Sequence, residues 1–286
     1  GRARRGAARR RRRAPASVPP ELNLNMVSNE TDLPHIRAQS YGVRSGYYSA
    51  AFLLQRIIAD KLDVDPTEIE IADISRKALN DDTDRFVAEI ILTDELPNGS
   101  GFVRHLYKNF EAILSDTILP PAEKVYLKKI HSDSHSGSCY DSCYECLKVY
   151  RNMNYHSLLD WRLALSMMRM MNDETFVCGA DKNFDFVELR GWLDNAIGLR
   201  DSFVQSFGYT HKEEVNGLPI IKWGQDKKNI IAIVHPFWNV ANLNYDENWL
   251  AKTITALRKY KDASGGSLSI IDTFNLHRRP GWCYEK

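Results

Sequence analysis

Cys139-Tyr-Asp-Ser-Cys143-Tyr-Glu-Cys146 carries three cysteines within eight residues. Thiols spaced this closely are poorly placed to pair with one another as disulfides, but they can surround one tetrahedral metal ion. Sulfur ligands favour zinc over magnesium or calcium. The segment therefore predicts a structural Zn²⁺ site in which Cys139, Cys143 and Cys146 are ligands.

A structural zinc site normally has a fourth protein ligand, and histidines lie on both sides of the cysteines. His156 follows Cys146 by ten residues, and His135 precedes Cys139 by four. We expect His156 to close the site because it directly precedes an expected helix, and His135 is the alternative. Four protein ligands leave no position for a reacting water, so the site would be structural rather than catalytic. The competing interpretation is three ordinary cysteines without a metal.

The composition of the chain is that of a globular protein with a core, since 43% of its 286 residues are hydrophobic. No apolar run reaches the roughly 18–20 residues of a membrane span, so we expect no membrane partner. The two cysteines outside the cluster, Cys178 and Cys283, do not form a disulfide pattern. A reducing, cytoplasmic location fits best.

The net charge of +1 conceals an uneven distribution of charge. Residues 1–13 hold eight of the 38 basic residues, and the remaining 30 face 37 acidic residues, a net charge near −7. The body of the chain is therefore not a basic nucleic-acid binder by composition. We interpret residues 1–40 as a basic, disordered arm and linker, although its arginines could also grip phosphates.

Apolar periodicity predicts a mixed α/β (α+β) fold in two parts. Residues 41–173 form the zinc-binding part, with helices expected at Ser45–Leu62, Phe102–Leu114, Pro121–Ile130 and Leu158–Met171, and strands at Ile69–Ile74 and Phe86–Leu92. Ser45 is the expected N-cap of the first helix. Residues 174–286 form a smaller α/β domain, with helices expected at Phe186–Ile197 and Asn248–Tyr260, and strands at Leu218–Trp223, Ile230–His235 and Leu268–Asp272.

Two arginines are candidates for contact with DNA. Arg104 lies in the first turn of the helix that follows the Gly99-Ser-Gly101 turn, whose amides could receive a phosphate. Such a turn can also simply begin the helix. Arg151 follows the cysteine cluster directly and could hold a nucleic-acid strand or orient the zinc site.

The C-terminal part offers a different, enzymatic interpretation. His235 and Asp272 each end an expected strand, and a His and an Asp at neighbouring strand ends could form a metal-dependent nuclease site. However, the acid-x-Lys pattern expected on a catalytic strand is absent around Ile220–Trp223. The chain also contains no G-x-x-x-x-G-K-[ST] phosphate loop, so we expect no ATPase activity from it alone.

Four sequence segments point to a known family. They are Ser49-Ala-Ala-Phe-Leu-Leu-Gln55, Asp94-Glu-Leu-Pro-Asn-Gly-Ser-Gly101-Phe, the cysteine segment extended through Leu-x-x-Tyr150-Arg-Asn152, and His156-x-Leu-Leu-Asp160. With these segments, the run from Ser45 to Met171 resembles the zinc-binding domain at the C-terminus of MrfA-like DEAD/DEAH-box helicases. The same domain occurs in DrmB of the bacterial DISARM anti-phage system. The family pattern has four cysteines, whereas this segment has three.

The resemblance implies a structural zinc site attached to superfamily 2 helicase machinery that acts on DNA. It carries over Cys139, Cys143 and Cys146 as zinc ligands and makes His156 the fourth. The expected function is that of a non-catalytic subunit, or the C-terminal region, of a helicase assembly in anti-phage defence. Its expected partners are DNA and a helicase motor, and residues after Asp173 are not covered by the resemblance.

Overall fold

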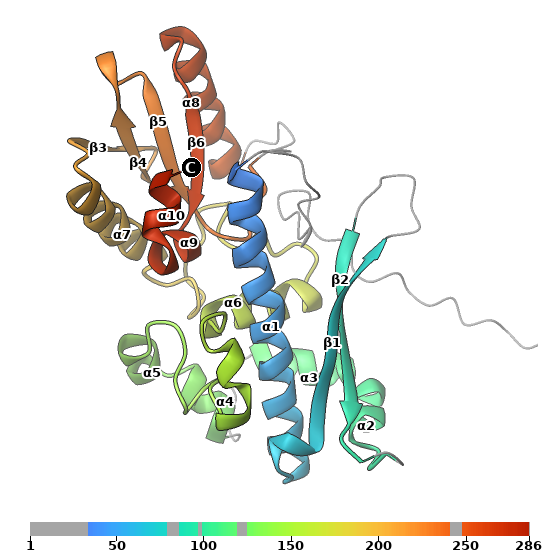
Figure 1. Ribbon diagram of the computed structural model, residues 1–286. Helices are drawn as coiled ribbons and strands as arrows, with labels where there is room; N and C mark the ends of the chain where they lie inside the picture. Colours follow the sequence, from blue (N-terminus) through green and yellow to red (C-terminus); the bar gives the residue numbers. More distant parts are fainter. Residues whose placement is uncertain (1–33, 79–85, 97–98, 119–124, 241–247, 286) are drawn as a thin grey trace, which may run out of the picture.

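A computed structural model of the chain describes residues 34–78, 86–96, 99–118, 125–240 and 248–285 (Figure 1). Of the predicted arm and linker at residues 1–40, residues 1–33 lie outside the described residues, and residues 34–40 form the start of a helix instead. The fold is the expected mixed α/β class, with helices around a two-stranded and a four-stranded sheet. None of the helices in the described part of the chain combines the length and apolar character that a bilayer crossing requires.

The long helix α1 (Pro34–Leu62) is the central element of the molecule (Figure 1). It packs against α6 (Trp161–Asn172) of the metal-binding region and also against β6 (Leu268–Asp272) and α9 (Thr273–Arg278) near the C-terminus. The helix begins before Ser45, so the N-cap prediction for this residue is wrong. Ser45 instead lies inside the helix, fully buried, and its hydroxyl donates to the carbonyl of Leu158.

The elements between α1 and the cysteines form an antiparallel ribbon followed by short helices. The ribbon pairs β1 (Ile69–Ala78) with β2 (Phe86–Asp94), and its register shifts between Ile71 and Asp73. The helices are α2 (Phe102–Lys108), α3 (Phe110–Ile118), α4 (Val125–Ile130) and α5 (Asp133–Ser138). The single helix predicted for Phe102–Leu114 is broken at Asn109, whose side-chain amide donates to the carbonyl of His105 and caps α2.

The C-terminal elements build a four-stranded sheet in the order β3-β4-β5-β6. β3 (His211–Val215), β4 (Leu218–Trp223) and β5 (Asn229–Val234) form an antiparallel meander, and β6 pairs parallel to β5 after the crossover helix α8 (Trp249–Ser264). The helix α7 (Trp192–Phe207) packs against β3 and β4, and the short helices α9 and α10 (Pro280–Glu285) follow β6. The strands β4, β5 and β6 agree with the prediction, whereas β3, α9 and α10 were not predicted.

Buried side chains before and after Asp173 belong to one continuous apolar cluster. Two glycines of α1 allow its close approach to the segment that follows β5. A Cβ at Gly46 would lie 2.3 Å from Cζ of Phe237, and one at Gly42 would lie 2.7 Å from Cβ of Pro236. The helix therefore covers the ends of β5 and β6, and it connects both regions of the chain. The domain division at Asp173 stays a prediction.

Candidate metal centre

The three cysteines converge with His135 on one point in the described part of the chain. The ligand atoms of His135, Cys139, Cys143 and Cys146 all lie within 4.8 Å of one another. The Sγ–Sγ distances are 3.9 Å for Cys139–Cys146 and 3.6 Å for Cys143–Cys146, and Nε2 of His135 lies 3.6 Å from Sγ of Cys143. These distances exclude disulfide bonds, in which the sulfurs are about 2.05 Å apart.

The spacing fits a tetrahedral zinc ion. With Zn–S bonds of about 2.3 Å and a Zn–N bond of about 2.0 Å, a regular tetrahedron has S–S edges of about 3.8 Å and S–N edges of about 3.5 Å. The two S–S distances of 3.9 and 3.6 Å and the S–N distance of 3.6 Å are close to these edges, and the cluster fits a structural zinc site. Three thiolates and one imidazole also match the ligand preference of zinc.

Local structure explains how two short segments bring these ligands together. The hydroxyl of Ser132 accepts from the amide of His135 at 3.2 Å and caps α5. Cys139 caps the other end of the helix, where its amide donates to the carbonyl of His135 at 2.8 Å. His135 and Cys139 are four residues apart and share a helix face. The carbonyl of Cys143 accepts from the amides of three following residues, Cys146 to Lys148, which folds the chain into a tight turn.

The electrostatics of the cluster call for a cation. A hydrogen bond from the thiol of Cys139 lowers the pKa of Cys146, and the same bond raises the pKa of Cys139. The amide of Cys143 also donates to Sγ of Cys146 at 3.0 Å. One thiolate is thus stabilised by the protein alone, while a positive charge such as a metal ion would favour ionisation of Cys139 beside it.

The structure favours His135 over His156 as the fourth ligand, which corrects our preference from the sequence. Nε2 of His156 lies 2.8 Å from Oδ1 of Asn152 and 3.1 Å from the carbonyl oxygen of Val149. His156 is therefore bound to the 3₁₀ helix η2 (Tyr150–Tyr155) and is not part of the cluster. The four-residue spacing of His135 and Cys139 is the sequence signal that would have identified the correct histidine.

Trp161 and Arg162, at the start of α6, donate hydrogen bonds to backbone carbonyls of the metal-binding segment. The indole of Trp161 donates to the carbonyl of Cys139 at 3.0 Å, and its ring lies against His135 with centroids 5.0 Å apart. The guanidinium of Arg162 donates to the carbonyls of Ser136, Cys139 and Tyr140 at 2.7–3.1 Å. Asp160 caps α6 by accepting from the amides of Arg162 and Leu163, and burial raises its pKa to about 6. These contacts fasten the metal-binding loop to α6.

The candidate DNA-binding arginines lie on the surface and are not brought together with each other by any described contact. The side chain of Arg151 is 65% exposed, and its Nη1 lies 3.5 Å from a carboxylate oxygen of Glu95. Arg104 is exposed on α2. The amides of Gly101 and Val103 donate to the carboxylate of Asp94 at 2.8 and 2.9 Å. The start of α2 is thus neutralised within the chain and does not support the phosphate-binding interpretation of this turn.

His235 and Asp272 do lie at neighbouring strand ends, as the sequence indicated, but both are buried. Asp272 pairs with Val234, the residue before His235, in the parallel β5–β6 ladder. The carboxylate of Asp272 accepts from the amide and side chain of Asn275 and caps α9, while His235 packs against Cys178. Burial lowers the pKa of His235 to about 3 and raises that of Asp272 to about 6. These roles are structural, and the arrangement gives no support to a nuclease site.

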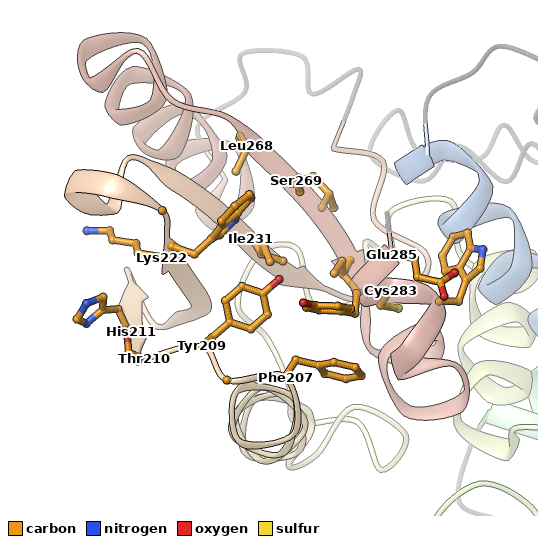
Figure 2. A pocket seen from close by; sticks show the side chains of 17 residues that line it. Phe207, Tyr209, Thr210, His211, Lys222, Ile231, Leu268, Ser269, Cys283 and Glu285 are labelled. Atoms are coloured by element: carbon orange, nitrogen blue, oxygen red, sulfur yellow. The ribbon is translucent and has the colours of Figure 1, made fainter.

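A hollow of about 690 Å³ lies on the C-terminal sheet, away from the metal cluster (Figure 2). Its floor includes Ile231 and Ser269, and its walls include Phe207 at the end of α7, Tyr209 just after this helix, and Cys283 on α10. The lining combines apolar, aromatic and polar side chains, such as Ile231, Tyr209 and Lys222. Among the described residues, potential metal ligands converge at the cysteine cluster and not at this hollow.

The comparisons with known proteins agree with the metal site. Residues 50–147 match the sequence profile of the family described as the MrfA Zn-binding domain. The chain carries a domain of this type. The matched range contains all four residues of the cluster. No curated protein and no solved structure matches the chain.

Proposed function

We propose that this chain is a non-catalytic, zinc-stabilised region of a superfamily 2 DNA helicase assembly. The observation that carries the proposal is the convergence of His135 with three cysteines inside the range that matches the MrfA Zn-binding domain. The chain has no phosphate-binding loop of its own, so a DEAD/DEAH-box motor would supply ATP hydrolysis. That motor would be part of the same polypeptide or a separate subunit.

In this proposal His135, Cys139, Cys143 and Cys146 hold the zinc ion. When bound, zinc supplies four bonds that replace packing as the source of local stability. The ligands tie the end of α5 to the turn Cys143–Cys146, and Trp161 and Arg162 attach this unit to α6. Because α6 packs on α1, the metal site fixes the central helix on which the rest of the chain is assembled.

We propose that Arg104 and Arg151 contribute contacts to DNA. Both are exposed, and the pair between Arg151 and Glu95 is long and solvent-exposed, so it costs little to replace with a phosphate contact. The resemblance to DrmB supports a role in anti-phage defence. The reduced, closely spaced thiols support a cytoplasmic location.

The ligand set is tested by measuring zinc in the purified protein by atomic emission. We expect one zinc per chain in the wild type and a large loss in His135→Ala, because three sulfurs leave the fourth position to water. His156→Ala is the matched control and should keep its zinc, since it loses only the contacts with Asn152 and Val149. Zinc loss in His156→Ala with retention in His135→Ala would overturn the assignment.

DNA binding is tested by fluorescence anisotropy with labelled duplex and single-stranded oligonucleotides over a salt series. We expect binding that weakens with salt, and Arg104→Ala and Arg151→Ala should each reduce the slope of log K against log salt for the duplex by about 0.9. Arg190→Ala is the control, because Arg190 is 62% exposed and paired with Asp133, much as Arg151 is with Glu95. Absence of binding to either DNA would reject this part of the proposal and favour a pure adaptor of other proteins.

A further inference from the structure

One ridge of α1 carries two aromatic residues between two arginines, at a spacing of four residues. Arg44, Tyr48, Phe52 and Arg56 follow one another at this interval, so they form a stripe along the helix. The stripe is about 18 Å long at a rise of 1.5 Å per residue. Arg44 is exposed, Tyr48 is half-buried, and the guanidinium of Arg44 lies 5.6 Å from the centroid of the Tyr48 ring.

The 3₁₀ helix η2 adds the ring of Tyr155 to this stripe. The ring of Tyr155 stacks on that of Tyr48, with centroids 5.0 Å apart and an interplanar angle of 26°, and it also contacts Phe52. Tyr155 remains 37% exposed and Tyr150 is 81% exposed. Two flat rings are thus held in a stack by packing, while part of the outer ring remains open to solvent.

The other end of the stripe is continued by Tyr144 from the metal-binding turn. Nη1 of Arg56 donates to the carbonyl of Tyr144 at 3.3 Å, and the ring of Tyr144 meets that of His156 edge to face. Tyr144 is 64% exposed. Its position depends on the metal-binding turn, so the zinc site and this surface are physically connected.

The charges beside these rings are mixed but leave cations available. Within the described residues Arg44 forms no ion pair, whereas Nη1 of Arg151 lies 3.5 Å from a carboxylate oxygen of Glu95 and the charge of Arg151 also helps to lower the pKa of Asp65. Asp60, which is exposed one turn after Arg56 on α1, is the acidic group nearest in sequence to the stripe. Arg44 lies beside the rings at one end of the stripe, whereas Arg56 at the other end donates to the carbonyl of Tyr144 and lies 4.9 Å from the centroid of the Tyr126 ring.

We propose that this surface binds an unpaired DNA strand, with bases stacked on the tyrosines and phosphates beside the arginines. We name it the tyrosine platform, and its residues are Arg44, Tyr48, Tyr144, Tyr150, Arg151 and Tyr155. The inference rests on the proposed DNA-linked function and specifies the form of DNA. Only an unpaired strand offers base faces for stacking, whereas a duplex hides them.

A protein partner is the main competing occupant, because tyrosine and arginine are also enriched where proteins bind one another. The composition of the platform favours DNA. Its exposed large side chains are tyrosines and Met153, and the tyrosine rings present flat faces on which bases can stack.

The test measures anisotropy of a labelled thymidine oligonucleotide and of a duplex of equal length with the full chain. We expect tighter binding of the single strand, and a loss of about 5- to 150-fold in Tyr155→Ala, which corresponds to about 1–3 kcal/mol per stacked base. Tyr155→Phe keeps the ring and should bind within about twofold of the wild type. Tyr260→Ala is the matched control, because Tyr260 on α8 is also 37% exposed.

Two further variants keep the result interpretable if Tyr155→Ala folds poorly. Tyr150→Ala removes a ring that is 81% exposed and should also weaken single-strand binding while zinc content and melting temperature stay constant. Arg44→Ala should lower the salt slope for the single strand by about 0.7, a change that loss of a ring does not produce.

The possible outcomes separate the two proposals. Wild-type binding with no effect of the tyrosine variants, or equal affinity for duplex and single strand, overturns the tyrosine platform and leaves the proposed DNA-linked function standing. Absence of binding to both DNAs overturns both. Unchanged DNA binding in Tyr150→Ala and Tyr155→Ala, together with lost association with a helicase motor, would assign the surface to a protein partner instead.

Discussion

The metal-binding loop and the C-terminal sheet satisfy their backbone hydrogen bonds in different ways. In the sheet, β4 and β5 pair along their length, and their central residues are fully or almost fully buried aliphatic side chains. In the loop 139–160, the only regular element is a six-residue 3₁₀ helix, and side chains bind many of the carbonyls. Tyr126 donates to the carbonyl of Cys146, Asn152 to that of Leu147, and Arg162 to those of Cys139 and Tyr140.

The two regions therefore differ in the source of their stability. Burial of aliphatic area stabilises the sheet through many small terms that are distributed over the strands. The loop has fewer such residues and depends on the metal ligands and on a few polar side chains that are far apart in the sequence. Substitution of a metal ligand should therefore destabilise mainly the loop, and substitution of a buried aliphatic residue should destabilise mainly the sheet.

The largest effect is expected from metal removal. Structural zinc contributes about 10–16 kcal/mol of apparent binding free energy, as much as the whole stability of a typical domain. Chelation should therefore unfold the loop, and hydrogen exchange at the amides of Cys139–Leu147 should accelerate far more than at Ile230–Val234 in β5. Mass spectrometry of deuterium uptake measures both. Equal acceleration in the two segments would show that loop and sheet unfold as one unit.

A smaller effect is expected from a cavity in the sheet. Ile233 is fully buried in β5, so Ile233→Ala should lower the unfolding free energy by about 2–5 kcal/mol while the protein keeps its zinc. Ile91→Ala is the control, because Ile91 is 38% exposed in β2 and should change stability little. Urea denaturation and metal analysis of the same samples check both statements. Zinc loss in Ile233→Ala would contradict the separation of the two regions.

The sheet was easier to predict from the sequence than the loop, because its buried strands are local apolar runs whereas the loop depends on contacts between distant residues. The strands β4 and β6 were located because they are continuous apolar runs between turn residues, a signal contained within each segment. The short, exposed strand β3 lacks such a run, since three of its five residues are exposed, and was missed. The start of α7 was placed too early because Gly191, at φ +74°, separates the helix from the preceding turn, and apolar spacing does not show this.

The zinc site was predicted as a type of site but not as a complete ligand set. Cysteine spacing indicates a tetrahedral sulfur site from the sequence alone. The choice of histidine depends on which of two short helices turns its imidazole toward the sulfurs, and that is decided by Asn152, Val149 and the cap at Ser132. The burial of His235 and Asp272 under α1 likewise depends on contacts between segments about 190 to 230 residues apart, which no local pattern contains.

The smallest effect is expected at Asp272, a residue of the sheet region whose side chain, like those in the loop, binds the backbone, because it accepts from the amide of Asn275. Burial raises the pKa of Asp272 to about 6 from 3.8, so folding favours its protonated form. Its contribution to stability is therefore present below about pH 4 and is lost as pH rises through about 6. A shift of about two units corresponds to about 3 kcal/mol.

Asp272→Asn cannot ionise and should lack this loss. The variant retains an oxygen that can accept from the amide of Asn275, but it loses the bond from the Asn275 side chain, so it should be less stable than the wild type at low pH. The deficit should shrink as pH rises from about 4 to about 7, because only the wild type then has to bury a charge. Urea denaturation at several pH values measures the unfolding free energy of both proteins. The zinc ligands and His235 are the same in both, so their contributions drop out of the difference. A deficit that stays constant over this range would show that Arg279, whose charge lowers the pKa of Asp272, keeps the carboxylate ionised throughout, and that this end of the sheet carries a buried ion pair.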